Sequence, residues 1–384
     1  MKNIFAFVAL SVPLLAAGQS YIGLFNHNSI DRNADRVMQY SPTSEGYIYR
    51  KNGDNLYTRA LYGGNTAFRI ETSDRPIFGA FHGKDNRNIH FKVKTADRWL
   101  RLDSVAECQS YYRGGERRYE LSDPQWGKGR ISITALAPFD REAGIWKIEA
   151  SDMPAGAEIV GICVPTVKIQ LNRNGDMGAD PANAFAPDPD VQTQETVSMP
   201  VGGGHKTFYV EYFDKKIDAG NQPRLADVFA EADRHRTELS GILEINTPDP
   251  YFNVLGPVIT HSAEGSWDGK TWLHGAIGWR GTLSGWRGAY CGDFLGWHDR
   301  ARTHFDAYAK SQVDNVAPVY PHPSQDSEKN GARAEKKWGT QMYSNGYICR
   351  SPERKDQMHH YDMNLCYIDE LLWHLKWTGD LEYV

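Results

Sequence analysis

The stretch that decides the fold reads T-P-D-P-Y-F-N-V at 247–254, S-W-D-G-K-T-W-L-H-G-A-I-G-W-R-G at 266–281 and G-W-R-G-A-Y-C-G-D-F-L-G-W-H-D-R-A-R-T-H-F at 285–305. Its tryptophans are Trp267, Trp272, Trp279, Trp286 and Trp297, and the polar side chains among them are Asp268, His274, Arg280, Arg287, Asp293 and Asp299. Indole faces stack on the C–H faces of a sugar ring, and charged groups bind its hydroxyls. The mixture predicts a carbohydrate site; the alternative is a tryptophan-rich core with ion pairs at its rim.

The composition is that of a globular, aromatic-rich chain. The chain has 384 residues, of which 24% are charged and 12% are aromatic, and its formal net charge is -5. This length predicts two domains. Because the charge is negative and no basic run is present, we expect no binding to nucleic acid or to an anionic membrane surface. The expected partner is a carbohydrate substrate.

The N-terminus has the pattern of an export signal. Lys2 precedes an apolar run at 4–17, and small residues lead to Gly18. The run is too short to span a bilayer stably, so we expect a signal peptide at 1–18 that is cleaved near Gly18. A retained membrane anchor is the alternative. The mature chain is expected to be periplasmic or secreted, without membrane contact.

The sequence carries no pattern for a metal or an organic cofactor. The five cysteines are odd in number and widely spaced, which does not suit a disulfide framework or a zinc site. They are Cys108, Cys163, Cys291, Cys349 and Cys366. The acidic residues at 176, 180, 188 and 190 lack the spacing of an EF-hand, and no dinucleotide fingerprint is present.

The first half of the chain has a β pattern. Short candidate strands bounded by Gly, Asp, Asn or Pro recur from 21 to 167, which indicates an antiparallel sandwich. They lie at 46–50, 56–61, 67–71, 89–93, 99–103, 118–121, 130–135, 144–150 and 158–164. A long irregular excursion is expected at 171–206, after which the sheet resumes at 207–213. We assign 19–222 to this domain.

The second half has a helical pattern. Pro223 opens an amphipathic helix, so 223–246 is expected to be a connector before a helical domain at 247–384. Further helices are expected at 294–313 and at 364–377, the second with a buried stripe and a stop at Gly379. The stripe is Leu365, Ile368, Leu371, Leu372 and Leu375. Since Asp380 has the position of another helix N-cap, we expect a longer polypeptide; a short packed tail is the alternative.

This order of parts resembles the six-hairpin (α/α)₆ glycoside hydrolases, and in particular a branch from polysaccharide-degrading bacteria. The matching segments are 247–253, 279–280, 285–293, 296–305, 357–364 and 377–380. The resemblance implies a toroid of twelve helices with a sugar pocket at one end, of which 247–384 is the first part. It also implies an exported, inverting hydrolase of plant or host glycans. In this family one catalytic carboxylate often lies in a later hairpin, so the resemblance puts one of the pair beyond Val384.

Hydrolysis of a glycosidic bond generally uses two carboxyl groups, one to protonate the leaving oxygen and one to activate water. We predict Asp293 and Asp268 as catalytic. The alternative for Asp293 is a helix N-cap, and the alternative for Asp268 is a turn residue.

The predicted substrate-binding residues combine indoles, guanidinium groups and polar groups near the start of the last helix. They are Trp267, Trp279, Arg280, Trp286, Arg287, His360 and Asp362. The alternatives are ion pairs of the arginines with Asp293 or Asp299, and a capping role for Asp362.

Two other functions stay open at this point. A toroid-type polysaccharide lyase could use Asn345, Arg350, His360 and Tyr361 to neutralise a uronate and abstract its proton. A chain without a second carboxylate could bind glycans without turnover. A near-ultraviolet-absorbing unsaturated product would identify the lyase, and binding without new reducing ends would identify the non-catalytic protein.

Overall fold

A computed structural model describes residues 39–83, 85–96, 98–167, 180–191, 193–275, 280–285, 288–312, 348–352 and 361–384. The described strands and helices all belong to one compact unit, Ser41–Val384. The expected signal peptide at 1–18 lies outside the described residues. Among the described helices, none has both the length and the apolar character that crossing a membrane requires.

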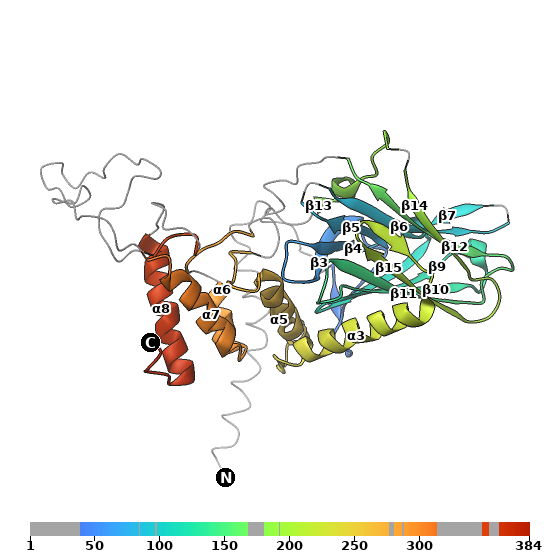
Figure 1. Ribbon diagram of the computed structural model, residues 1–384. Coiled ribbons are helices and arrows are strands. Elements are labelled where there is room, and N and C mark those ends of the chain that lie inside the picture. The colour runs from blue at the N-terminus through green and yellow to red at the C-terminus, as the bar shows by residue number, and fades with distance from the viewer. Residues whose placement is uncertain are drawn as a thin grey trace, which may run out of the picture. The chain divides into compact units, whose positions relative to one another are not determined.

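Two antiparallel sheets form the first part of this unit (Figure 1). One sheet has the order β1-β2-β8-β9-β10-β11-β15-β16, and the other has the order β13-β3-β4-β5-β6-β12-β14, with β7 beside β6. The strands of the first sheet are β1 (Ser41–Pro42), β2 (Ile48–Lys51), β8 (Glu107–Arg113), β9 (Glu116–Ser122), β10 (Arg130–Leu136), β11 (Ala143–Ser151), β15 (Lys206–Phe213) and β16 (Lys216–Asp218). Those of the second are β13 (Asp180–Pro181), β3 (Leu56–Tyr62), β4 (Arg69–Ser73), β5 (Ile77–Phe81), β6 (Arg87–Lys94), β12 (Glu158–Pro165), β14 (Glu195–Pro200) and β7 (Trp99–Arg101). The predicted β-sandwich architecture is confirmed.

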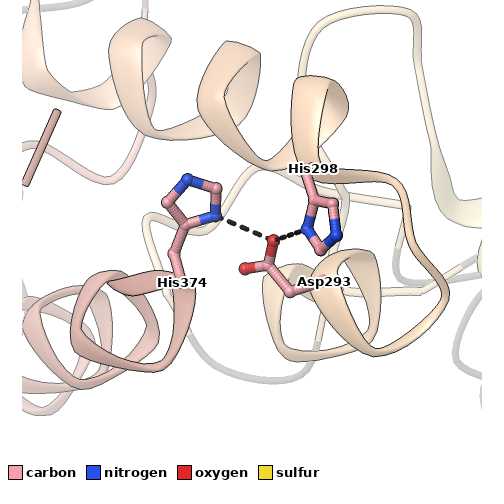
Figure 2. A group of neighbouring side chains, drawn as sticks. All are labelled: Asp293, His298 and His374. Carbon is pink, nitrogen blue, oxygen red and sulfur yellow. Dashed lines mark hydrogen bonds and ion pairs between the residues drawn. The ribbon is translucent and has the colours of Figure 1, made fainter. Parts of the chain in front are cut away.

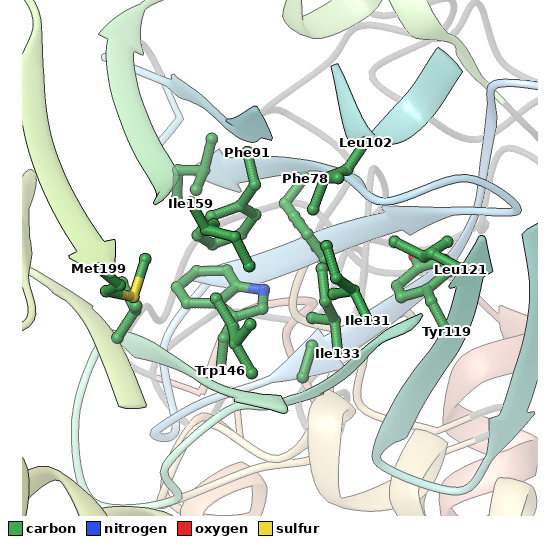
Figure 3. Close-up of a cluster of buried hydrophobic side chains, with 14 of the residues drawn as sticks. Phe78, Phe91, Leu102, Tyr119, Leu121, Ile131, Ile133, Trp146, Ile159 and Met199 are labelled. Atoms are coloured by element: carbon green, nitrogen blue, oxygen red, sulfur yellow. The ribbon is translucent and has the colours of Figure 1, made fainter. Parts of the chain in front are cut away.

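Alternation along the strands builds the core between the two sheets. In β10, Ile131, Ile133 and Ala135 are buried while the residues between them are more exposed, as the two-residue period of a strand requires. Trp146 of β11 is fully buried and meets Phe78 of the other sheet edge to face, with ring centroids 5.2 Å apart (Figure 3). This contact joins the two layers through their aromatic side chains.

Part of the expected irregular excursion at 171–206 is regular. β14 pairs with β12 in antiparallel register, with Met199 opposite Ile159. Only Met199 is fully buried in this strand, so the alternation that marks a strand in sequence is weak at this edge of the sheet. The prediction of an irregular segment was therefore wrong for Glu195–Pro200, while residues 168–179 lie outside the described part.

The expected connector is α3 (Gln222–Ser240). Asn221 caps it by accepting a hydrogen bond from the Arg224 backbone N–H at 3.1 Å. Leu225 and Ala232 are buried against Leu136 and Ile145 of the first sheet, which confirms the predicted apolar face. The helix therefore lies along the sandwich (Figure 1).

The remaining helices are α4 (Pro250–Asn253), α5 (Leu255–Ser266), α6 (Gly288–Phe294), α7 (His298–Ala309) and α8 (Tyr361–Thr378). The helix predicted at 294–313 is confirmed in part, because α7 covers 298–309 of it, whereas Phe294 ends α6 and a break at 295–297 separates the two helices. Gly296 has a φ of 77°, and the Trp297 N–H bonds the Gly292 carbonyl at 2.8 Å, which closes α6 as a glycine C-cap does. These described helices do not form a toroid.

The packing face of α8 differs from the predicted stripe. Leu365, Ile368 and Leu372 are exposed, whereas Met363, Tyr367, Glu370 and His374 are buried. Both sets repeat at three and four residues, so periodicity could not choose between them, and hydropathy favoured the wrong one. The predicted stop is confirmed, since Gly379 has a φ of 72° and its N–H bonds the Leu375 carbonyl at 2.7 Å.

Replacing Trp146 by alanine should lower the free energy of unfolding by about 3–5 kcal/mol, because a fully buried indole between two sheets leaves a cavity. Urea denaturation followed by circular dichroism measures the change. The matched control is Trp99→Ala, since Trp99 is 57% exposed, and it should shift stability by less than about 1 kcal/mol. Equal losses in the two variants would contradict the bridging role of Trp146.

Candidate functional site

Asp293 lies at the meeting point of three helices. Its Oδ1 accepts a hydrogen bond from Nδ1 of His298 and another from Nδ1 of His374, each at 2.8 Å, while its second oxygen makes neither bond (Figure 2). Asp293 is in the last turn of α6, His298 begins α7 and His374 is on α8. The side chains of Asp293 and His374 are 4% and 0% exposed, and that of His298 is 40% exposed. The N-cap alternative for Asp293 is thus wrong, because the residue lies inside α6.

Two glycines let the helices come this close. A Cβ on Gly292 would lie 2.3 Å from Trp272 Cη2, and a Cβ on Gly285 would lie 2.7 Å from the backbone nitrogen of Tyr367 on α8. Only glycine permits such approaches without moving the neighbouring group. Since Gly292 precedes Asp293, the close contact with the Trp272 indole fixes the turn that carries the carboxylate.

A pocket of about 260 Å³ opens beside Asp293. Its lining combines two carboxyl side chains with aromatic rings: Ala289, Tyr290, Asp293, Phe294, Glu370, Trp373 and Trp377. Trp373 and Trp377 are 44% and 52% exposed, whereas Glu370 is 1% exposed. Large exposed rings beside buried carboxyls are an arrangement suited to a polar ligand that has apolar faces.

Polar and aromatic contacts position several of the side chains that line this pocket. The Tyr290 hydroxyl donates to Asp369 Oδ2 at 2.7 Å, and burial together with the Asp369 carboxylate raises the pKa of Tyr290. Lys376 Nζ lies 4.2 Å from the centre of the Trp373 ring, within the range of a cation–π contact. The Phe294 and Trp377 rings meet edge to face at 6.4 Å.

Trp267 and Trp272 belong to a hydrophobic core. They are 5% and 1% exposed, and their ring centroids are 4.7 Å apart. The core also contains Ala289, Ala301, Phe305, Tyr308, Ile348 and Tyr367. The positions of these two tryptophans match the alternative prediction of a tryptophan-rich core. Trp267 therefore has little ring surface to offer a sugar.

The Arg280 side chain binds backbone carbonyl groups. Its guanidinium donates to the carbonyl of Gly265, to that of Asn65 at 3.1 Å and to that of Trp267 at 3.2 Å. Burial lowers its pKa. These hydrogen bonds connect the loop between β3 and β4 to the end of α5. The Arg280 side chain is therefore positioned by backbone carbonyl groups, and not by the alternative ion pair with Asp293 or Asp299.

Asp268 closes a tight turn. Its Oδ1 accepts hydrogen bonds from the backbone N–H groups of Lys270 at 2.9 Å and Thr271 at 2.6 Å, and Gly269 has a φ of 91°. These are the contacts of an Asx turn. Asp268 is not among the residues that line the pocket beside Asp293. The geometry matches the turn alternative, and a catalytic role for Asp268 stays a prediction.

The structure leaves several predicted site residues undescribed. Trp279, Trp286, Arg287 and His360 lie outside the described residues, as does Asn345 of the lyase alternative. Asp362 is exposed in the first turn of α8, where a carboxylate favours the positive end of the helix. Of the predicted set, Asp293 is the residue that the structure places in a pocket.

Sequence reasoning missed the partners of Asp293. His298, Glu370, His374, Trp373 and Trp377 were not proposed as site residues. One signal was present in the sequence: Glu370 and His374 are four residues apart, which puts both on one face of a helix. Ionisable residues at that spacing within an apolar helix indicate a buried polar cluster as readily as a solvent-exposed face.

In the part of the chain that the structure describes, none of the five cysteines forms a disulfide bond. Cys291 lies on α6 next to the site, and burial raises its pKa to about 11. A thiol with a raised pKa is a poor nucleophile at neutral pH. The surroundings of Cys291 therefore do not favour a role as a catalytic nucleophile.

One known domain family matches the chain. Residues 84–244 match a domain of unknown function, DUF4450. The matched segment runs from the start of β6 to just past α3, so it contains most of the sandwich and the connector but none of the pocket. No protein of curated function matches the chain.

Protonation of His304 should destabilise this part of the protein in acid. His304 is 1% exposed, its Nδ1 accepts from the Trp272 backbone N–H at 3.1 Å, and burial lowers its pKa to about 3. An unfolded histidine has a pKa of about 6.5, so the unfolded state binds the extra proton between these values. The unfolding free energy should therefore fall by about 1.4 kcal/mol per pH unit as pH drops below about 6.5.

Urea titrations at pH 6.5, 6.0, 5.5 and 5.0 measure this slope. His90 and His261, whose pKa values are also lowered by burial, add to it in the same direction. In His304→Asn the slope should decrease by about 1.4 kcal/mol per pH unit relative to the parent chain. The exposed His205 supplies the control, because His205→Asn should keep the parent slope. An unchanged slope in His304→Asn would contradict the assignment.

Proposed function

We propose that this protein acts on a carbohydrate and that its reaction is the hydrolysis of a glycosidic bond. One observation carries the proposal: a single pocket of about 260 Å³ combines the carboxyl groups of Asp293 and Glu370 with the exposed indoles of Trp373 and Trp377. The indoles offer stacking surfaces to the C–H faces of a sugar ring, and the carboxyls offer acceptors to its hydroxyls.

Two carboxyl groups also meet the chemical requirement of glycoside hydrolysis. One protonates the oxygen of the leaving sugar, and the other activates the attacking water or attacks directly. Asp293 and Glu370 come from different helices, so their separation is fixed by how α6 and α8 pack. In this proposal Glu370 takes the role of the second carboxylate, which the resemblance placed beyond Val384.

The proposal includes an exported enzyme that inverts the anomeric configuration and takes a plant or host glycan. The resemblance to six-hairpin glycosidases supports this, as do the sandwich, the connector α3 and the pocket on α6 and α8. In this proposal the helical part of the chain is the first part of a toroid. Export is supported by the pattern at 1–18.

Turnover should depend on both carboxyl groups. Asp293→Asn and Glu370→Gln should each lower kcat by about 10²–10⁴-fold, because general acid–base assistance has that magnitude. Released reducing ends from a panel of plant and host polysaccharides give the rate, and the anomer of the first product, followed by NMR, gives the stereochemistry. Asp299→Asn is the matched control, since Asp299 is an exposed carboxylate in the first turn of α7.

The outcomes separate the competing functions. Loss of turnover in both test variants and full activity in Asp299→Asn supports the hydrolase. An unsaturated product that absorbs in the near ultraviolet would identify the lyase instead, in which case new reducing ends would appear together with the chromophore. Glycan binding that Trp373→Ala abolishes, with no turnover by the parent chain, would make the protein a non-catalytic binder.

A further inference from the structure

Asp293 differs from two other buried carboxylates, Asp74 and Glu116, in the groups that neutralise it. Asp74 contacts the Arg117 guanidinium at 2.6 Å, and Glu116 contacts that of Arg113 at 2.6 Å. Among the described residues, the ion-pair partners of Asp293 are two imidazoles. A buried carboxylate needs a compensating positive charge, and a neutral imidazole supplies none.

We infer that Asp293, His298 and His374 form a binding site for a divalent transition metal ion, of which Zn²⁺ is the best fit. Each of the three residues offers one ligand atom, and these atoms all lie within 4.8 Å of one another. They come from three different helices that are packed together, so the site is held by the fold (Figure 2). A cation here would compensate the buried carboxylate.

Two of the three distances between ligand atoms are close to those that zinc requires, and the third is at most 4.8 Å. Zinc binds histidine nitrogen and carboxylate oxygen at about 2.0–2.2 Å, which puts ligand atoms at a tetrahedral centre about 3.3 Å apart. The two Nδ1–Oδ1 distances here are 2.8 Å. Opening each pair by about half an ångström would admit the ion. His298 begins its helix and is 40% exposed, so it has room for that movement.

The ligand types determine the kind of metal. Two imidazoles and one carboxylate suit zinc and its first-row neighbours, whereas magnesium and calcium prefer sets made of oxygen atoms. Three protein ligands leave a coordination position for water or substrate, as in catalytic zinc sites. Because Asp293 also lines the pocket, that position is accessible from it.

This site departs from the sequence expectation of no metal. The ligands are five and 76 residues apart along the chain, so no short motif marks them. The site itself stands on geometry and charge. A division of roles follows only if the proposed function is correct: the cation held by Asp293 would polarise the attacking water, and Glu370 would protonate the leaving oxygen.

Metal binding is measured directly on the full chain, produced without a histidine tag. The protein is stripped with a chelator, given one equivalent of Zn²⁺ or Co²⁺ and desalted, and retained metal is quantified by mass spectrometry. We expect about one ion per chain. In Asp293→Asn and His298→Ala the dissociation constant, from competition with a chromophoric chelator, should rise at least about tenfold.

His235→Ala is the matched control, because His235 is a partly exposed helical histidine on α3. It should retain the parent affinity, and circular dichroism should show that all variants are folded. Visible Co²⁺ bands that His298→Ala weakens would place the ion at this site. The inference would be overturned if the parent chain retained no more metal than His298→Ala, or if His235→Ala lost as much metal affinity as His298→Ala. The assay uses no glycan, so its result is independent of the hydrolase test.

Discussion

His298 and His374 each donate a hydrogen bond to one oxygen of Asp293. The packing of α6, α7 and α8 depends on these two bonds. They connect α6, α7 and α8 at a point where the carboxylate is 4% exposed and His374 is fully buried. Polar groups that are removed from water must find partners inside the protein. The three helices therefore have a restricted set of positions in which this cluster is satisfied. The adjoining pocket, with Glu370 and its two indoles, follows from the same packing.

Close packing supports this polar cluster. Gly292 and Gly285 allow Trp272 and the backbone of α8 to approach the segment that carries Asp293. The tryptophans of the helical part thus have two different roles. Trp267 and Trp272 fill the core behind the site, whereas Trp373 and Trp377, which come from a later helix, face the pocket. Arg280 adds a link to the sandwich by donating to the Asn65 carbonyl.

How far the sequence predicted the structure varied with the element. Strands such as β10 and β11 alternate clearly, so their places were found to within a few residues, and α3 was found from its proline and its apolar face. β14 was missed because one residue of this edge strand is buried. On α8 the leucines are more hydrophobic than Glu370 and His374, so hydropathy predicted the wrong buried face. Glu370 and His374 are among the residues that pack inward.

By itself the sequence determined the sandwich and the connector helix, and it singled out Asp293 as a candidate catalytic residue. Strand period, proline and glycine positions and local composition act over a few residues, so these features are encoded where they occur. Only the tertiary structure decided which groups Asp293 meets. His298 and His374 lie on separate helices, and their contact with Asp293 depends on which face of α8 is buried. That choice is made by packing between distant segments, which local periodicity does not record.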